Sequence, residues 1–243
     1  MAASEKKTKK KPAPHTVALI VAAGSSTRMG AGVSKQFLEI NRHPVLAHTL
    51  RAFEAAKTVD QIVVVARTED ITHIASLAAQ YHIEKLAAVV EGGETRALSV
   101  QKGFERVHPK AKFVAIHDGA RCLVTPEIID KVVRAAYRHK AATAAAPVSD
   151  TVKTVNAKGF VESTVDRKKV FLAATPQVFD TNLYRAALAT VENFENMTDD
   201  NQLIESLPYP VKVVDCGKEN IKITHPADLA IAETILRERS KAT

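Results

Sequence analysis

The sequence predicts an α/β protein with a three-layer α/β/α arrangement around a mostly parallel, Rossmann-like sheet. Three observations predict this class. Short apolar runs rich in β-branched residues recur along the chain, stretches with helical spacing of apolar residues lie between them, and 243 residues suffice for one large domain. Because the apolar runs are nearly continuous rather than alternating, we expect helices to cover both faces of the sheet.

The individual elements follow from these patterns. The predicted strands cover 16–22, 61–66, 86–91, 113–118, 142–148 and 211–216. The predicted helices cover 44–56, 69–81, 95–107, 125–140, 180–192, 199–207 and the second half of 219–239. Pro44 suits the first turn of its helix, and Thr125 with Pro126 is typical of an N-cap followed by the first helical residue.

The alternation of strands and helices breaks at residue 150. From there to residue 179, apolar and polar residues alternate around "NAKG" (156–159), which indicates a β-hairpin turn. A lone hairpin has too little core to be stable in water. We therefore expect one domain over 15–243 with an inserted arm at about 150–170, packed against something else such as a second subunit.

Charge and composition narrow the class further. The net charge is +7, but residues 1–14 hold five Lys and one Glu and so account for +4 of it. We expect this segment to be a disordered basic tail, and the body to bind no nucleic acid. No apolar run suggests a signal peptide or a membrane span. Two cysteines without CxxC spacing indicate free thiols in the cytoplasm, and the nine scattered histidines indicate no structural zinc site.

Small or charged residues follow five of the predicted strands. The segments are "AAGSSTRMG", "GGETRALS", "HDGARC", "SDTVK" and "CGKENIKIT". In a sheet of this kind, ligands bind at the carboxyl ends of the strands. Such residues at five strand ends indicate a binding site there more strongly than any single motif does.

The first of these loops does not match either familiar phosphate-binding motif. Ser26 occupies the middle glycine position of the dinucleotide fingerprint, and Ala31 follows Gly30 where a P-loop needs lysine. What remains is a loop of backbone N–H groups with Arg28 and Lys35, which suits a triphosphate. The alternative is a solvated turn that carries two exposed cations.

Seven motifs together resemble one enzyme family. They are "AAGSSTRMG…SKQF", "GGETRALSV", "HDGAR", "PVSDTVK", "TVDRKKVFLAATPQVF", "TDDNQLIE" and "ENIKITHPADL". In order and spacing the chain is similar, over about 16–238, to the 2-C-methyl-D-erythritol 4-phosphate cytidylyltransferases of the non-mevalonate isoprenoid pathway. The resemblance implies a nucleotidyltransferase fold and a cytoplasmic homodimer with a swapped arm. It also implies transfer of CMP from CTP to methylerythritol phosphate, a polyol phosphate, with release of pyrophosphate and with Mg²⁺ as cofactor.

The resemblance also implies roles for particular residues. The catalytic residues would be Arg28, Lys35, Arg167 and Lys222. The nucleotide would contact Ala22, Ala23, Gly24, Gly93, Glu94, Arg96, Ser99, Asp118 and Gly119. The acceptor would contact Thr151, Arg167, Lys222, Arg121 and Thr175, and Asp118 is also a candidate Mg²⁺ ligand. The arm would carry Thr151 and Arg167 into the site of the partner subunit.

Such a reaction places modest chemical demands on the protein. The acceptor phosphate is already an anionic nucleophile, so in-line attack on the α-phosphorus needs positioning and charge neutralisation rather than a base. Glu94, Gly119 and Cys122 depart from the residues usual in the family, which leaves the ribose and magnesium contacts open. Two alternatives remain: a ribitol 5-phosphate cytidylyltransferase, and a non-catalytic nucleotide-binding regulator on the same fold.

Overall fold

A seven-stranded sheet forms the centre of the molecule in the computed structural model, which describes residues 15–24, 34–192 and 196–241. Its strands are β1 (Thr16–Val21), β4 (Gln61–Ala66), β5 (Leu86–Glu91), β6 (Phe113–Asp118), β7 (Ala141–Pro147), β10 (Phe171–Asp180) and β11 (Lys212–Asp215). The spatial order is β11-β7-β10-β6-β1-β4-β5. Only β10 runs against its neighbours among these strands. The mostly parallel sheet of the predicted fold class is confirmed.

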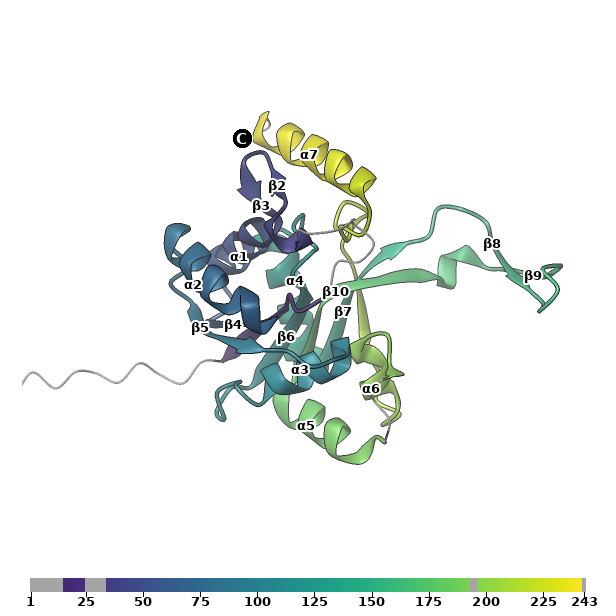
Figure 1. Cartoon of the computed structure of the whole chain (residues 1–243). Helices are drawn as coiled ribbons and strands as arrows, with labels where there is room; N and C mark the ends of the chain where they lie inside the picture. Colours follow the sequence, from purple (N-terminus) through teal and green to yellow (C-terminus); the bar gives the residue numbers. More distant parts are fainter. Residues whose placement is uncertain (1–14, 25–33, 193–195, 242–243) are drawn as a thin grey trace, which may run out of the picture.

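Helices cover both faces of this sheet (Figure 1). They are α1 (Val45–Ala55), α2 (Ile71–Gln80), α3 (Arg96–Phe104), α4 (Pro126–His139), α5 (Thr181–Thr190) and α6 (Asp200–Glu205). The last helix, α7 (Pro226–Lys241), packs instead in a separate cluster with Ile40 and Leu123. Because successive side chains of a strand point to opposite faces, Ala18 and Ile20 of β1 pack with α1, α2 and α4, whereas Val17 and Leu19 pack with α3, α5 and α6. The unbroken apolar run 17–21 of β1 therefore contributes side chains to two cores, one on each face of the sheet.

The capping signals in the sequence are mostly confirmed. The Thr125 hydroxyl accepts a hydrogen bond from the backbone N–H of Ile128, and Pro126 is the first residue of α4. Pro44 is the exception, because it lies in extended backbone as the last residue of β3 (His43–Pro44), which pairs with β2 (Glu39–Ile40). The predicted start of this helix is therefore wrong by one residue.

The strand β10 was not predicted as part of the central sheet. It lies between β6 and β7 and is antiparallel to both, so that Gln177 is paired with Ile116 on one side and Thr143 on the other. The alternating pattern of this stretch predicts extended backbone but does not say with which strands it pairs. The insertion of β10 brings residues 174–177 to the carboxyl ends of the parallel strands.

The predicted hairpin is confirmed, and it extends away from the sheet as a separate arm (Figure 1). Its strands are β8 (Val152–Val155) and β9 (Val161–Val165). In the turn between them, the Asn156 side chain accepts hydrogen bonds from the N–H groups of Lys158 and Phe160, and Gly159 has φ +83°. Glycine adopts this conformation without the steric cost that other residues incur.

No helix among the described residues combines the length and the apolar character that crossing a membrane requires. The expected basic tail, residues 1–14, lies outside the described residues.

Candidate active site

The ends of β1, β5 and β6 lie against one another through small residues. The N–H of Gly119 donates to the carbonyl of Val21, and a Cβ added at Gly119 would lie 3.3 Å from the Cβ of Ala22. A Cβ added at Gly92 would lie 2.6 Å from the Cβ of Ala23, which no real contact allows. The backbone after three parallel strands is thereby brought into one place, as the prediction of a shared site requires.

The residues predicted for the nucleotide gather at this place. Ser99 is 2% exposed on α3, and its hydroxyl bonds both the N–H and the carbonyl of Gly93. Gln36, from the short 3-10 helix η2 (Lys35–Phe37), is also buried and donates to the carbonyl of Ala22. The carboxylate-bearing Glu94 is exposed beside them. The structure thus places Ala22, Ala23, Gly93 and Ser99 together.

The loop that carries the first predicted cation is only partly described. Gly24 ends one described segment, and Lys35 lies one residue into the next. Arg28, the other cation predicted for the triphosphate, lies outside the described residues.

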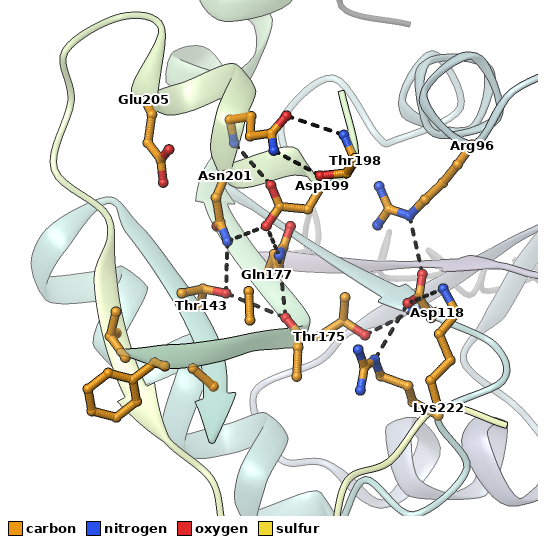
Figure 2. A pocket seen from close by; sticks show the side chains of 17 residues that line it. Arg96, Asp118, Thr143, Thr175, Gln177, Thr198, Asp199, Asn201, Glu205 and Lys222 are labelled. Carbon is orange, nitrogen blue, oxygen red and sulfur yellow. Dashed lines mark hydrogen bonds and ion pairs between the residues drawn. The ribbon is translucent and has the colours of Figure 1, made fainter. Parts of the chain in front are cut away.

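Three cations surround the carboxylate of Asp118, at the end of β6 (Figure 2). The Nζ of Lys222 lies 2.9 Å from Oδ2, the Nε of Arg96 lies 3.2 Å from Oδ1, and the Nε of Arg121 lies 3.5 Å from Oδ2. We call these four residues the Asp118 cluster. They come from three separate segments of the sequence-predicted site, since Asp118 and Arg121 share "HDGARC", and the structure brings them together.

The opposite charges within the cluster set the protonation states of Asp118 and Arg96. Burial by itself raises the pKa of Asp118, but the positive charges of Arg96, Lys222 and Arg121 outweigh it and hold that pKa well below its usual range. Burial likewise lowers the pKa of Arg96, and the carboxylates of Asp200 and Asp118 more than compensate and raise it. The Asp118 carboxylate and the Arg96 guanidinium are therefore charged at neutral pH. Three cationic side chains around one carboxylate give the cluster a surplus of positive charge that suits a phosphate ligand.

The segment that carries Lys222 is tied to the sheet by its neighbours. The N–H of Ile223 donates to the carbonyl of Ala120, and the Ile223 side chain is fully buried. The Nη1 of Arg121 donates to the carbonyl of Asn220 at 2.8 Å. These contacts join the end of β6 to a segment about one hundred residues further along the chain.

A second carboxylate supports Arg96 from the other side. Oδ2 of Asp200, the first residue of α6, lies 2.8 Å from Nη1 of Arg96, and Oδ1 accepts a hydrogen bond from the hydroxyl of Tyr184. Both Asp200 and Tyr184 are buried. Asp200 belongs to the motif "TDDNQLIE", for which the resemblance implies no particular site residue; membership of that motif is the sequence signal that points to it.

A pocket of about 480 Å³ opens beside the Asp118 cluster (Figure 2). The four residues of the cluster and Thr175 form one end. The other end is lined by residues that are not among the predicted site residues, including Thr143, Gln177, Asp199, Asn201 and Glu205. Hydrogen bonds from Gln177 and Asn201 to Asp199 hold this wall together. The wall depends on the insertion of β10, which explains why sequence patterns did not reveal it.

Two predicted acceptor residues lie away from this pocket in the same chain. Thr151 and Arg167 are exposed on the arm, where Arg167 donates to the carbonyl of Ser149, and neither lines the pocket. Within one chain, the structure does not bring them to the Asp118 cluster.

The surroundings of Asp118 do not fit a metal ligand. Both of its oxygens face cations, which a divalent ion would have to displace. Within residues 15–24, 34–192 and 196–241, no group of three His, Cys, Asp or Glu side chains is arranged to hold a metal ion. The predicted assignment of Asp118 as a Mg²⁺ ligand therefore gains no support from this geometry.

A mostly parallel sheet with a cation cluster at the carboxyl ends of its strands defines an α/β enzyme that handles phosphorylated ligands, and the comparisons with known proteins specify which. The model of the 2-C-methyl-D-erythritol 4-phosphate cytidylyltransferase family matches residues 16–238. This chain belongs to that family of nucleotidyltransferases.

Individual relatives agree with this assignment. A 2-C-methyl-D-erythritol 4-phosphate cytidylyltransferase of Synechococcus is 43% identical over 223 residues, which are 91% of this chain and 99% of the relative. The crystal structure of the 4-diphosphocytidyl-2C-methyl-D-erythritol synthase of Anaerococcus prevotii is 32% identical, with a TM-score of 0.81 over 91% of this chain and 96% of that one. The cytidylyltransferase structure from Thermus thermophilus is also 32% identical, with a TM-score of 0.73 over 90% and 98%.

Proposed function

We propose that this enzyme transfers CMP from CTP to 2-C-methyl-D-erythritol 4-phosphate, giving 4-diphosphocytidyl-2-C-methyl-D-erythritol and pyrophosphate. The observation that carries the proposal is the Asp118 cluster, which places three cations at the strand ends of a chain that belongs to this family over 16–238. Two phosphorylated substrates must meet for this reaction, and surplus positive charge reduces the repulsion between them.

The reaction is an in-line displacement at phosphorus. A phosphate oxygen of the acceptor forms a bond to the α-phosphorus of CTP, and the bond from that phosphorus to the bridging oxygen of the β-phosphate breaks, so that pyrophosphate leaves. We assign Arg28 and Lys35 to the triphosphate and the developing charge. We assign Lys222 and Arg121 to the acceptor phosphate, and the backbone around Ala22, Gly93 and Ser99 to the cytosine and ribose.

We propose that Mg²⁺ accompanies the phosphates of CTP rather than residing on the protein. Mg²⁺ usually retains several waters and binds substrate phosphates with few protein ligands, and the cations around Asp118 disfavour it as a ligand. The chemistry that Mg²⁺ supplies there is neutralisation of phosphate charge.

We further propose a homodimer in which the arm reaches the partner's site. Large apolar side chains on the arm and at its base are exposed in the single chain, including Phe160 at 69% and Leu172 at 62%. Burying them against a second copy would remove apolar surface from water and would carry Thr151 and Arg167 toward the partner's Asp118 cluster. We regard 15–243 as one domain and place the enzyme in the cytoplasm, where its two free thiols stay reduced.

The test is a pyrophosphate-release assay with CTP and a panel of polyol phosphates in the presence of Mg²⁺. We expect turnover with 2-C-methyl-D-erythritol 4-phosphate, and poor turnover when ATP or GTP replaces CTP, because a site closed around a pyrimidine excludes a purine. Equal or faster turnover of ribitol 5-phosphate would overturn the proposed acceptor. Tight CTP binding without pyrophosphate release from any acceptor would indicate the non-catalytic regulator instead.

A further inference from the structure

We propose that His117 and Thr175 are positioning residues, which fix the backbone of Asp118 and Arg121 through a series of hydrogen bonds. Each donor and each acceptor in this hydrogen-bonded chain is determined. His117 precedes Asp118 at the end of β6 and is fully buried. Thr175 lies on β10 and is 4% exposed. The inference deepens the proposed function and rests on it only in that Asp118 and Arg121 are taken to face the reacting phosphates.

The direction of the chain follows from donor and acceptor chemistry. The Nε2 of His117 lies 3.2 Å from the carbonyl oxygen of Arg121, which can only accept, so Nε2 carries the hydrogen. The ring is neutral, because burial deprives a charged imidazole of water, and this lowers the pKa of His117 even though the neighbouring carboxylate of Asp118 opposes the shift. Nδ1 is then an acceptor, and the hydroxyl of Thr175, 3.0 Å away, donates to it.

The same hydroxyl also joins this series of hydrogen bonds to the backbone of Asp118. Its oxygen accepts the backbone N–H of Asp118 at 3.0 Å, deep inside the protein. The order is therefore Asp118 N–H to Thr175 O–H to His117 Nδ1, and His117 Nε2–H to the carbonyl of Arg121. One imidazole in a single tautomer thus holds both ends of the turn 118–121, at Asp118 through the Thr175 hydroxyl and at Arg121 directly.

A second path ties the same turn to the segment that carries Lys222. Arg121 donates to the carbonyl of Asn220, and the side-chain amide of Asn220 donates 2.8 Å to the carbonyl of Thr175. Asn220 is 6% exposed. Thr175 is therefore the residue at which both paths meet, one through its hydroxyl and one through its carbonyl.

Such bracing has a physical purpose in this site. Arg96, Arg121 and Lys222 repel one another and converge on one carboxylate, so their placement depends on backbone that does not yield. A displacement of about 1 Å at a reacting group costs roughly 10²-fold in rate. The loss of the hydroxyl should therefore affect catalysis far beyond its effect on folding.

The kinetic test compares two buried threonines. Thr175→Val removes the hydroxyl from the chain, whereas Thr181→Val removes a hydroxyl that is equally buried and bonds only the backbone of residues 111 and 112, remote from the pocket. We expect Thr175→Val to lower kcat by about 10- to 100-fold, and Thr181→Val to stay within about twofold at a similar loss of thermal stability. Thr175→Ser, which restores the hydroxyl, should recover most of the loss. Equal kinetics in the two valine variants would overturn the proposal.

The spectroscopic test observes the tautomer directly. In full-length protein labelled with ¹⁵N-histidine, long-range ¹H–¹⁵N spectra report which ring nitrogen carries the hydrogen. We expect His117 as the Nε2–H tautomer, assigned by the signal that is missing in His117→Asn or, if that variant does not fold, by the signal most changed in Thr175→Val. In Thr175→Val, the Nδ1 resonance should move toward that of a pyridine-type nitrogen without a hydrogen bond.

The two readouts separate this inference from the proposed function. An Nδ1–H tautomer or an imidazolium at neutral pH would overturn the hydrogen-bonded chain whatever the enzyme acts on. Conversely, an Nε2–H tautomer in a protein that releases no pyrophosphate from CTP would leave the chain intact and overturn the proposed function alone.

Discussion

Replacing Asp118 by Asn should destabilise the protein markedly, because it removes the carboxylate that three cations share. The side chain of Asp118 is 10% exposed, and those of Arg121 and Arg96 are 15% and 24% exposed. Breaking a buried ion pair costs about 3–5 kcal/mol. Arg96 retains Asp200 and Lys222 is one-third exposed, so Arg121 loses most. We therefore expect the lower end, about 3 kcal/mol.

The assay is thermal and urea unfolding of Asp118→Asn beside a matched control. For a protein of this size, a loss of about 3 kcal/mol corresponds to a fall in Tm of about 6–12 °C. Glu69→Gln is the control, since it also replaces a carboxylate 3.0 Å from an arginine, but one that is 64% exposed, and should change stability by less than about 1 kcal/mol. Equal stability of the two variants would refute the view that the cluster is held by its central charge.

Three further predictions concern the proposed mechanism, the tail and the response to pH. Lys35→Ala should lower the rate of pyrophosphate release by roughly 10²–10³. Mixing this variant with Arg167→Ala under subunit exchange should restore roughly a quarter of wild-type activity, because half of the random dimers are mixed and each mixed dimer contains one intact site. Subunit exchange without recovery of activity would contradict the swapped arm. Deletion of residues 1–14 should leave activity and Tm almost unchanged, and a large loss of either would mean that the tail packs on the body. Burial lowers the pKa of His117 from 6.5 to about 3. Below pH 6.5 the imidazole therefore binds a proton in the unfolded chain but not in the folded protein, so the free energy of unfolding falls as the pH decreases, by about 2 kcal/mol at pH 5. Urea unfolding of His117→Asn should show a correspondingly smaller fall in stability between pH 7 and pH 5, and an unchanged fall would exclude His117 as its source.

The sequence predicted the features that depend on neighbouring residues. The cap at Thr125 is encoded within four residues, and the turn at Asn156–Gly159 within five. The run Val17–Ile20 shows apolar side chains on both faces of its strand, which suffices to predict a sheet covered on both sides. For such elements the physical cause lies within the segment, so the pattern determines the structure.

Features that depend on distant pairing were not predictable in this way. Extended backbone at 171–180 is compatible with any sheet edge, and only the hydrogen bonds to β6 and β7 place it at the centre. The resemblance named Arg96, Asp118, Arg121 and Lys222, but it assigned them to different substrates. It gave no sign that the three cations all pair with the carboxylate of Asp118. Asp200 and His117 were missed for the same reason, since their partners are remote in sequence or are backbone atoms.

The strand β10 also determines where this chain tolerates changes of length. It leaves the base of the arm and enters the centre of the sheet as one strand, with Phe171 paired to Pro147, Phe179 paired to Ala141, and a shift of register between Ala173 and Gln177. Loss or gain of one residue near the start of this strand would turn its side chains to the opposite face and remove the Thr175 hydroxyl from Asp118. Insertions at the tip, 156–159, move no residue of the pocket. Among homologues, indels should therefore accumulate at the tip and be absent from the base.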